Sequence, residues 1–391
     1  MTTGYSHIVI GAGGIGSAAA YWLSRAGAER VLVLEQYGLL PTQGSSGDHS
    51  RIIRHSYHST KYTRLTPAMF DTWAEVEDHS GFQIYTKTGG IDLARTGTPG
   101  HSTLGEYRGA LGAVGIPYED LSVDDVRSRW PQWRVEDDTV GMWQEDTGIL
   151  DIRKSVSAHT SMALAAGVEF RPHTKVTDIE LRDGSVKVHA GSEAFEGEQL
   201  IVSTGSWLGD LMGSLGFSFP LTLSQEQVSY FATPKLRDFT PDRHPVWIYH
   251  GDQHYYGFPV YGEAATKIAR DMRGHFIESD ERRFEGDDIE GEILTEFLRS
   301  HLPDAVGPAL LHRTCVYDMP ADRDFVVDAL PGHPNVTVFN GAGHAGKFAS
   351  LMGRILADLA TSGETRHDIS AFSLDRPAIT DPDFAPAFIL R

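Results

Sequence analysis

The chain contains one cysteine, Cys315, in the stretch HRTCVYDMP (residues 312–320). A thiolate is a strong nucleophile, and its reactivity depends on the pKa and the surroundings of the thiol. The basic neighbours His312 and Arg313, or Arg51 if the fold brings it close, would lower that pKa and favour covalent chemistry. The alternative is that Cys315 is a small buried hydrophobe, as most free cysteines are.

Two arginines three positions apart, Arg51 and Arg54, lie in the segment GSSGDHSRIIRH (residues 44–55). If this segment forms a helical turn, the two guanidinium groups share one face. The segment follows the second strand of a predicted nucleotide domain, on the side where ligands bind. An arginine there can hold a carboxylate through two parallel hydrogen bonds. The alternative is an ordinary surface helix that starts with capping serines.

A lysine with apolar neighbours, Lys267, lies in QHYYGFPVYGEAATKIARD (residues 253–271). The β-prone residues, interrupted by glycine and proline, predict antiparallel strands that form one wall of a pocket. Poor hydration would leave a concentrated positive charge on Lys267. The alternative places it on the solvent face of an edge strand.

The segment GAGHAGKF (residues 341–348) matches a Walker A phosphate loop except at its last position, where Phe348 replaces Ser or Thr. A P-loop NTPase is therefore one alternative function, although the usual hydroxyl ligand of Mg²⁺ is missing. Lys347 precedes an apolar helix, where the helix dipole disfavours a cation. A bound anion would stabilise it; otherwise the lysine extends into solvent.

The elements that would position these residues begin with a strand, HIVI (residues 7–10), the loop GAGGIG (residues 11–16), a helix and a second strand, RVLVL (residues 30–34). This order is the dinucleotide-binding fingerprint. Gly11 makes the tight turn, Gly13 lets the backbone approach a pyrophosphate, and Gly16 allows close packing of helix on strand. Glu35 follows the second strand and can accept hydrogen bonds from a ribose.

Two later features favour FAD over NAD. Short strands between residues 168 and 204, after a helix in residues 151–167, resemble the meander of FAD-dependent oxidoreductases. The glycine-rich loop near the C-terminus is the kind of segment that such proteins fold against the cofactor.

Length and composition limit the class of protein. The 391 residues favour two domains, and 40% hydrophobic and 22% charged residues are ordinary for a globular enzyme. The net charge of −19 argues against nucleic-acid and anionic-membrane partners. A single cysteine excludes an intramolecular disulfide, and the N-terminus lacks a signal-peptide pattern, so we expect a cytoplasmic protein. No run approaches the ~18 apolar residues of a membrane helix, and we expect no metal site.

The motifs GAGGIG, SRIIRH, YYGFP followed by Lys267, TCVYD, and GHAGKF followed by HDISAFSLDRPA occur in the order and approximate spacing of the monomeric sarcosine oxidase family. The resemblance runs from about His7 to Pro377. It implies an α/β plus α+β fold, with a Rossmann-like FAD-binding domain and a second, mainly antiparallel-sheet substrate domain. The implied FAD-binding domain comprises residues 1–85, 145–220 and 320–391, and the substrate domain comprises residues 86–144 and 221–319.

The resemblance also implies the chemistry. A secondary amino acid loses a hydride to flavin, the imine is hydrolysed, and oxygen reoxidises the flavin to give hydrogen peroxide. The enzyme is expected to be a monomer whose partners are a small amino acid and O₂. An alternative is a dehydrogenase of the same fold that passes electrons to a carrier other than oxygen. A non-catalytic FAD-binding module is another.

Residues are assigned by resemblance to three groups. Cys315 matches the cysteine that forms a thioether to the flavin 8α-methyl. The catalytic group is Lys267, Arg51, Tyr317 and Asp271, with Lys267 supplying the cation that activates oxygen. The substrate-binding group is Arg54, Lys347 and Tyr256, the first two holding the carboxylate. The cofactor-binding group is Cys315, Gly11, Gly13, Gly16, Glu35, Ser45, Ser50, Arg51, Val176, Gly343 and Lys347.

Two positions depart from the family pattern. Asp271 occupies a position where the family has histidine, and the C-terminal loop is about one residue shorter and lacks an aromatic residue before Lys347. An acid in the pocket predicts a substrate with an additional cationic group, in place of sarcosine itself.

Overall fold

The computed structural model describes residues 4–387. The dinucleotide-binding loop belongs to the first of its sheets. Eight strands form this sheet in the order β10-β11-β12-β1-β2-β9, with β20 beside β12 and β19 beside β20. Their bounds are β1 (Tyr5–Ile10), β2 (Val31–Leu34), β9 (Glu169–Arg171), β10 (Asp178–Arg182), β11 (Ser185–Ala190), β12 (Glu193–Val202), β19 (Val326–Leu330) and β20 (His333–Asn340). The strands β1, β2, β9 and β20 run parallel to their neighbours, except that β19 is antiparallel to β20.

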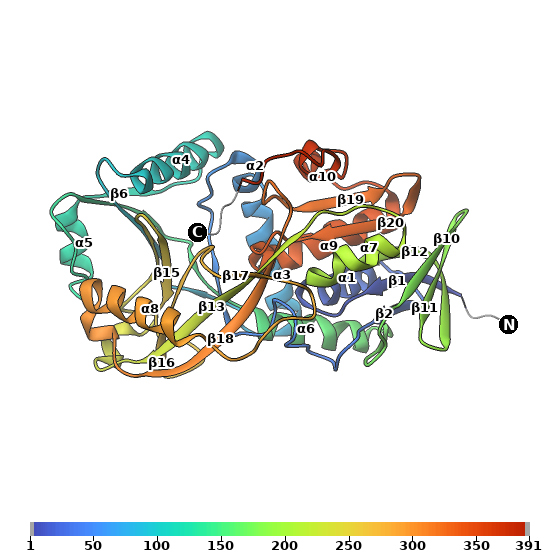
Figure 1. Ribbon diagram of the computed structural model, residues 1–391, viewed down its shortest axis with the longest axis horizontal. Coiled ribbons are helices and arrows are strands. Elements are labelled where there is room, and N and C mark those ends of the chain that lie inside the picture. The colour runs from blue at the N-terminus through green and yellow to red at the C-terminus, as the bar shows by residue number, and fades with distance from the viewer. Residues whose placement is uncertain (1–3, 388–391) are drawn as a thin grey trace.

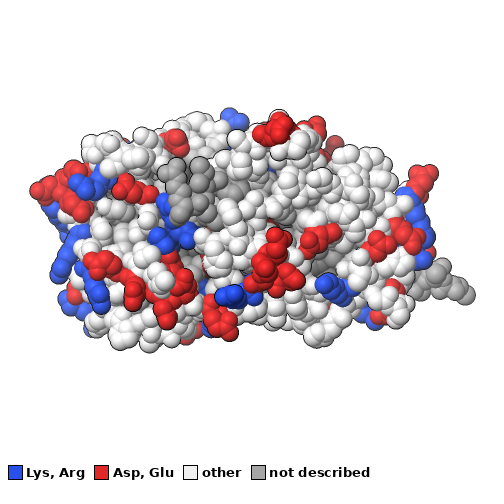
Figure 2. Space-filling view, in the orientation of Figure 1, with Lys and Arg blue, Asp and Glu red and all other residues white. Residues whose placement is uncertain are grey.

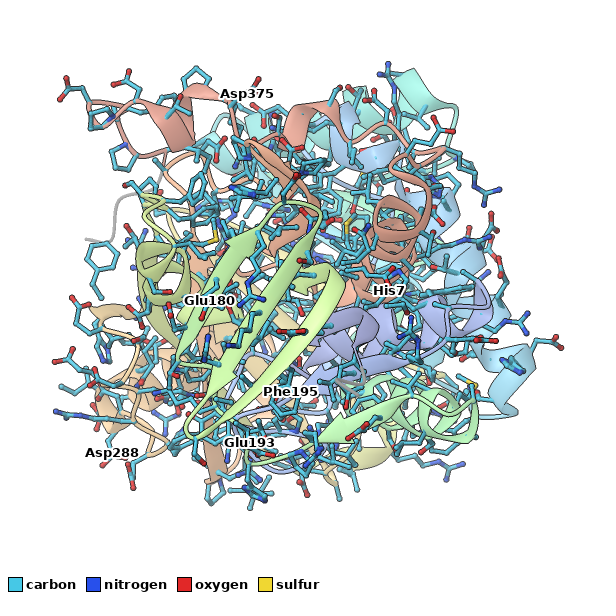
Figure 3. The ribbon with its side chains drawn as sticks, turned by 90° about the vertical axis from the view of Figure 1, so that its right-hand side faces the viewer. His7, Glu180, Glu193, Phe195, Asp288 and Asp375 are labelled. Atoms are coloured by element: carbon cyan, nitrogen blue, oxygen red, sulfur yellow. The ribbon has the colours of Figure 1, made fainter. Side chains whose placement is uncertain are left out.

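The ten-residue strand β12 joins two kinds of pairing in this sheet. Its first half pairs antiparallel with β11, and its second half lies between the parallel strands β1 and β20. Figure 3 shows the antiparallel ribbon from the end of the molecule, with Glu180, Glu193 and Phe195 on its strands. The predicted meander after residue 168 is therefore present, and it returns the chain to the parallel sheet.

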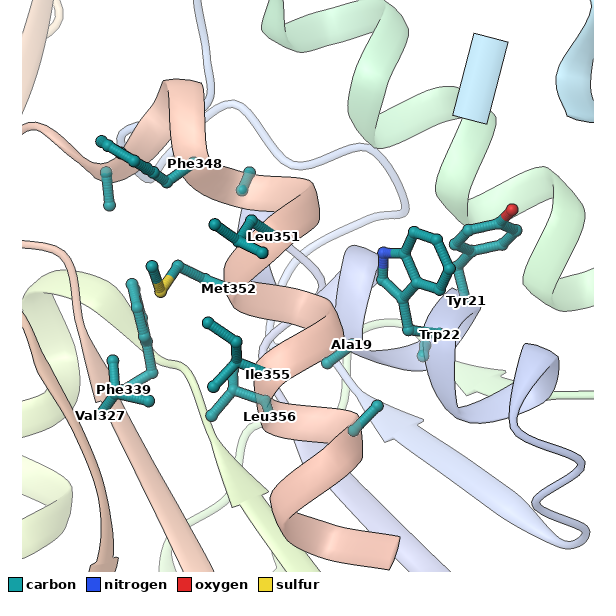
Figure 4. Packing of buried hydrophobic residues seen from close by; sticks show 14 of the residues in the cluster. Ala19, Tyr21, Trp22, Val327, Phe339, Phe348, Leu351, Met352, Ile355 and Leu356 are labelled. Atoms are coloured by element: carbon teal, nitrogen blue, oxygen red, sulfur yellow. The ribbon is translucent and has the colours of Figure 1, made fainter. Parts of the chain in front are cut away.

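Helices cover this first sheet. They are α1 (Gly14–Arg25), α2 (Thr60–Thr63), α3 (Thr66–Ser80), α6 (Ile152–Ala165), α7 (Leu208–Ser214), α9 (Ala349–Ser362) and α10 (Pro377–Thr380). In Figure 4, Leu351, Met352, Ile355 and Leu356 of α9 lie between α1 and strands β19 and β20. This apolar layer fixes the C-terminal loop before α9 against the dinucleotide-binding loop before α1.

The second sheet has nine strands in the order β17-β13-β16-β15-β14-β5-β7-β6, with β18 also paired to β13. Its strands are β5 (Gly90–Arg95), β6 (Glu119–Leu121), β7 (Thr139–Gln144), β13 (Thr222–Ala232), β14 (Val246–His250), β15 (His254–Phe258), β16 (Ala265–Arg270), β17 (His275–Ile277) and β18 (Ala309–Met319). All pairs are antiparallel except β14 with β5. Helices α4 (Pro99–Val114), α5 (Val123–Arg129) and α8 (Asp288–His301) accompany it.

The long strands β13 and β18 connect the two halves of the molecule. Figure 1 shows them side by side across the middle, between the second sheet on the left and the helices of the first sheet on the right. A third sheet, β3 (Ser50–Ile53), β8 (Gly148–Asp151) and β4 (Tyr85–Lys87), completes the mixed α/β and α+β architecture that the sequence predicts. Short 3₁₀ turns include residues Ala345–Phe348, directly before α9.

Candidate active site

A single large cavity of about 840 Å³ brings most of the predicted site residues together. It extends from the dinucleotide-binding loop of the first sheet to the inner face of the second sheet. Of the sixteen residues that the sequence assigns, only Gly16 does not border it. The others are Gly11, Gly13, Glu35, Ser45, Ser50, Arg51, Arg54, Val176, Tyr256, Lys267, Asp271, Cys315, Tyr317, Gly343 and Lys347.

The dinucleotide end of the cavity is built by short-range contacts. A Cβ atom on Gly16 would lie 1.8 Å from the carbonyl oxygen of Gly11, so the close packing of helix on strand requires glycine. The Glu35 carboxylate is held at the end of β2, where Oε2 accepts the N–H of Ala12 at 2.7 Å and Oε1 accepts that of Tyr37 at 2.9 Å. Its remaining lone pairs are positioned to accept hydrogen bonds from a sugar.

The segment with two arginines is a strand, not the predicted helical turn. Ser50–Ile53 pairs antiparallel with β8, which places Ile52 opposite Ile149. The β-branched pair Ile52 and Ile53 favours this buried strand, so tertiary pairing determined the conformation. Arg51 lies on β3, whereas Arg54 follows the strand, and positions three apart on an extended chain do not share a face.

Arg51 and Arg54 consequently have different surroundings. Arg51 donates to the carbonyl oxygens of Ser45 at 2.6 Å and of Ser50 at 2.8 Å, which fixes it near the dinucleotide end. Arg54 lies 3.4 Å from Asp92 Oδ1 and donates to the Tyr107 hydroxyl at 3.3 Å. Asp92 also contacts His250 Nε2 at 2.9 Å. Asp92 and Tyr107 therefore hold the guanidinium of Arg54 in place.

Lys347 has no carboxylate within ion-pairing distance among residues 4–387. Its Nζ donates to the Tyr57 hydroxyl at 2.8 Å and to the carbonyl oxygen of His344 at 3.3 Å. Burial, together with the charge of Arg54, holds the pKa of Lys347 well below its usual value. The lysine does not extend into solvent, and an anion bound beside it would stabilise its charged form.

Lys267 is buried, with 3% of its surface exposed, on the interior strand β16. Its Nζ donates to Asp48 Oδ2 at 2.5 Å, to Ser50 Oγ at 3.0 Å and to the carbonyl oxygen of Ser50 at 3.1 Å. Burial lowers the pKa of Lys267, and the Asp48 carboxylate opposes this shift by stabilising the charged lysine. The alternative of a solvent-facing edge strand is therefore wrong.

Cys315 and Tyr317 lie on one face of β18 and both border the cavity. Burial raises the pKa of the Cys315 thiol to about 11, against the opposing charges of Arg51, Arg282 and Lys267. The prediction that basic neighbours lower the pKa of Cys315 is therefore wrong. Those charges do lower it, but the loss of hydration on burial raises it by more. Of the predicted neighbours, His312 instead contacts Ser229 Oγ through Nδ1 at 2.8 Å.

Asp271 forms a fork-to-fork ion pair with Arg323. Arg323 Nη1 donates to Oδ2 at 3.1 Å, and Nη2 donates to Oδ1 at 3.0 Å. The Tyr317 hydroxyl donates weakly to the same Oδ1 at 3.4 Å. Burial alone would raise the pKa of Asp271, but the charge of Arg323 lowers it. The protein itself neutralises Asp271, which removes the reason for predicting an extra cationic group on the substrate.

The C-terminal loop completes this cavity and does not form a separate phosphate site. Gly343 has φ of +77°, and a Cβ there would lie 2.5 Å from the Tyr317 ring, so the loop packs directly on β18. Asp318 accepts the N–H of Gly343 at 3.1 Å. Phe348 is fully buried, and Lys347 is directed at Tyr57 in the cavity. This geometry does not support the NTPase alternative.

Several residues of the cavity and its supports were missed by the sequence interpretation. These are Asp48, Tyr57, Asp92, Arg323 and His344. Asp48 lies inside the arginine segment, and its carboxylate in a glycine-rich loop was the one available signal. His344 lies in the GAGHAGKF loop, but the sequence interpretation gave it no role. Tyr57, Asp92 and Arg323 reach the site through long-range packing, so their sequence neighbourhoods carry no comparable motif.

The described part of the chain gives two further findings. Within residues 4–387, no group of three or more His, Cys, Asp or Glu side chains is arranged to hold a metal ion, and no helix could cross a membrane. Figure 2 shows acidic and basic side chains interspersed on the face in view.

The first sheet, its dinucleotide-binding loop and the cavity together are typical of an oxidoreductase that binds a dinucleotide cofactor. The chain belongs to the DAO family of FAD dependent oxidoreductases, whose sequence pattern matches residues 6–359. The cavity fits that cofactor, because it joins the dinucleotide-binding loop to Cys315 and Lys267 without interruption.

Curated relatives match nearly the whole chain. Monomeric sarcosine oxidase of Bacillus sp. (strain B-0618) is 31% identical over 387 residues, covering 97% of this chain and 98% of the relative. That of Streptomyces avermitilis is 33% identical over 389 residues, covering 97% and 99%. N-methyl-L-tryptophan oxidase of Citrobacter koseri is 30% identical over 379 residues, covering 95% and 99%.

Solved structures share the fold. The open form of NikD, an unusual amino acid oxidase of nikkomycin biosynthesis, superposes with a TM-score of 0.85 and 23% identity. The match covers 100% of both chains. The L-proline dehydrogenase of P. horikoshii gives a TM-score of 0.82 at 16% identity, covering 95% of this chain and 97% of that one.

Proposed function

We propose that the protein is an FAD-dependent oxidase of an N-methyl or cyclic secondary amino acid, with the flavin attached to Cys315 through a thioether. The observation that carries this proposal is Lys347, a part-buried lysine without a carboxylate partner within residues 4–387, beside Arg54 in the cavity that contains Cys315. A substrate carboxylate supplies the missing anion. The curated relatives, named as oxidases of sarcosine and N-methyl-L-tryptophan, support the same substrate class.

Each protein group has a distinct role in this proposal. FAD, when bound, accepts the hydride from the carbon next to nitrogen and passes the electrons to oxygen. Arg54 and Lys347 bind the carboxylate and so fix that carbon. Tyr256 and Tyr317 form the adjacent wall. Lys267 provides a fixed positive charge where oxygen takes on negative charge.

The remaining assigned residues serve the cofactor. We assign Gly11, Gly13 and Glu35 to the dinucleotide. We assign Arg51 to the neighbourhood of the flavin ring, where its guanidinium is held by the carbonyl oxygens of Ser45 and Ser50. The other cofactor assignments are Gly16, Val176, Gly343 and the side chains of Ser45 and Ser50.

A dehydrogenase is the second candidate, and one observation favours it. All three N–H groups of Lys267 are directed at acceptors of Asp48 and Ser50, and Asp48 balances the charge of the lysine. A balanced charge attracts superoxide less than an isolated one. Slow reoxidation of the reduced protein in air would select the dehydrogenase.

We extend the proposal to organisation. We propose an FAD-binding domain of residues 1–85, 145–220 and 320–391 and a substrate domain of residues 86–144 and 221–319. The strands of the first sheet fall in the former and those of the second sheet in the latter, which supports this division. We propose a monomer whose partners are the amino acid and oxygen. Location in the cytoplasm stays a prediction.

Two experiments test the function. Peroxide release is measured with sarcosine, other N-methyl amino acids, pipecolate and proline, and turnover of at least one is expected. No turnover and no bleaching of the flavin with any of them would contradict the proposal.

The covalent link is tested by acid precipitation of the native protein and of Cys315→Ala. We expect the yellow colour to stay in the native pellet. The variant should release its flavin to the supernatant or contain none. Release of flavin from the native protein would rule out the thioether.

A further inference from the structure

The ion pair between Arg323 and Asp271 belongs to the wall of the substrate end of the cavity. Both residues border that cavity together with Lys347, Tyr317 and Arg54. The exposed fraction is 27% for the Arg323 side chain and 34% for that of Asp271. A ligand in the cavity can therefore reach this ion pair. An ion pair that only stabilised the fold could be covered completely.

The pair offers hydrogen-bond donors and has few free acceptors. Both oxygens of Asp271 accept from Arg323, and Oδ1 also accepts from Tyr317. A guanidinium has five N–H groups. Arg323 uses one on each Nη for Asp271, and the second N–H of each Nη has no protein acceptor among residues 4–387. A ligand group beside this pair should therefore be an acceptor, not a donor.

The charges around the substrate end favour a negatively charged acceptor. The three cations Arg54, Lys347 and Arg323 border this region. Two carboxylates pair with them, Asp92 with Arg54 and Asp271 with Arg323. Two further bordering acids, Asp322 and Asp324, pair with Arg376 and Lys61.

Among these cations only Lys347 has no resident carboxylate, and the proposed function gives it the α-carboxylate of the substrate. A second carboxylate on the substrate would share the N–H groups of Arg323 with Asp271.

The backbone holds Arg323 in an uncommon conformation. Its φ is +57°, in the left-handed region that non-glycine residues rarely adopt. The turn is fixed on both sides, because the N–H of Arg323 donates to the carbonyl oxygen of Pro320 at 2.9 Å and His344 Nε2 lies 3.2 Å from the carbonyl oxygen of Arg323. Strained residues of this kind concentrate at ligand sites.

We propose that Arg323, oriented by Asp271, forms a second anion subsite that binds a carboxylate on the side chain of the substrate. The substrate class is then an N-alkylated acidic amino acid. This inference rests on the proposed function, in which Arg54 and Lys347 hold the α-carboxylate. Asp271 is a positioning residue for the guanidinium, and Arg323 determines specificity.

The binding test uses dicarboxylates and does not need turnover. Succinate and glutarate are titrated into the holoenzyme and compared with their monoamides, following the perturbation of the flavin spectrum. We expect at least one dicarboxylate to bind ten times more tightly than its monoamide, because the amide removes only the second charge. Equal binding of both dicarboxylates and their monoamides would overturn the subsite.

Variants locate the preference. Arg323→Gln should bind dicarboxylate and monoamide within twofold of each other. The double variant Arg323→Gln, Asp271→Asn avoids an unpaired carboxylate in the cavity wall and keeps the test valid if the single variant does not fold. Arg376→Gln is the matched control, because Arg376 holds the same turn through Asp322 but does not border the cavity. A preference that survives in the double variant, or is lost equally in the control, would contradict the proposal.

Turnover separates this inference from the proposed function. N-methyl-L-aspartate and N-methyl-L-glutamate should have kcat/KM at least tenfold above N-methyl-L-asparagine and N-methyl-L-glutamine, mainly through KM. Equal rates for acidic and neutral substrates would reject the subsite and leave the oxidase proposal intact. A preference for N-methyl-L-lysine would show that Asp271 binds a cationic side chain, and it would also reject the anion subsite. If no secondary amino acid reduces the flavin, the proposed function itself fails.

Discussion

Lys267, which is buried, and Lys347, which is part-buried, both border the cavity and differ in what surrounds their charge. Lys267 has a resident carboxylate, Asp48, and two further acceptors from Ser50. Lys347 has only a hydroxyl and a carbonyl oxygen. A resident counter-ion favours the charged form of a lysine that is out of water. Where none is present, a ligand anion can favour the charged form instead.

This difference bears on the two proposed roles. Asp48 favours the charged form of Lys267 for the oxygen reaction, but it also weakens the attraction of that charge for superoxide. A group that recognises a carboxylate gains from having no internal competitor for that carboxylate. The predictions below alter one lysine or its partner at a time.

The largest effect is expected for Lys347→Met. Loss of the charge-assisted contact to the substrate carboxylate should lower kcat/KM by about 10²-fold to 10³-fold, chiefly through KM. Steady-state peroxide assays measure this. Lys235→Met, which removes an exposed lysine paired with Asp304, is the control and should change little. An unchanged KM in Lys347→Met would mean that the carboxylate binds elsewhere.

Lys267→Met should separate the two half-reactions. Reoxidation of the reduced flavin by oxygen should slow by about 10²-fold, because a preorganised charge is lost where negative charge develops. Anaerobic reduction by the amino acid should change only a few-fold. Stopped-flow absorbance records both rates. If reduction slowed and reoxidation did not, the roles of the two lysines would be reversed.

Asp48→Asn removes the feature that distinguishes the lysines. Breaking a buried ion pair by deleting one partner should lower the free energy of unfolding by about 3–5 kcal/mol. Without the carboxylate the pKa of Lys267 falls further, so the oxygen reaction should decline at a lower pH than in the native protein. Denaturant unfolding and the pH profile of reoxidation measure the two effects.

The matched control for Asp48→Asn is Asp304→Asn, whose partner Lys235 is exposed. It should cost at most about 1 kcal/mol. Equal losses of stability in both variants would show that burial does not strengthen the Asp48 pair.

The smallest expected effect is on pH dependence through Lys347. Its pKa is lowered in the folded protein, so the unfolded chain binds more protons between that pKa and the ordinary value of 10.5. Stability should therefore rise with pH across this window, and Lys347→Met should abolish that rise. Acetate binding should weaken as pH rises through the pKa of free Lys347, because binding then requires uptake of a proton.

Calorimetry of acetate binding in two buffers with different ionisation enthalpies detects the proton uptake. Lys347→Met provides the reference without it. If the native protein and the variant took up equal numbers of protons on acetate binding, a group other than Lys347 would be the one that is protonated.

Local motifs in the sequence predicted much of this molecule. The dinucleotide-binding loop, Glu35 at the end of β2 and the strands β15 and β16 around Lys267 are all present, because each depends on contiguous residues. The residues that surround the reactive groups could not be predicted in the same way. Asp48 and Lys267 are separated by 219 positions, and Asp271 and Arg323 by 52.

Two errors show how tertiary structure overrides local reasoning. The spacing of Arg51 and Arg54 fits a helix, but pairing with β8 makes the segment a strand. The basic residues next to Cys315 suggested a lowered thiol pKa, but burial, which sequence neighbours do not reveal, is the larger influence. The interpretation of Asp271 also changed, because the sequence did not reveal its partner Arg323.

The most direct test of the account is anaerobic reduction of the flavin by matched pairs of amines with and without a carboxylate. Sarcosine and the other N-methyl amino acids, pipecolate and proline are compared with dimethylamine, the corresponding decarboxylated amines, piperidine and pyrrolidine. We predict that at least one secondary amino acid bleaches the flavin and that its carboxylate-free counterpart does so at least 10²-fold more slowly. Equal bleaching within each pair, or none by any amino acid, would contradict the central claim that Arg54 and Lys347 select a carboxylate.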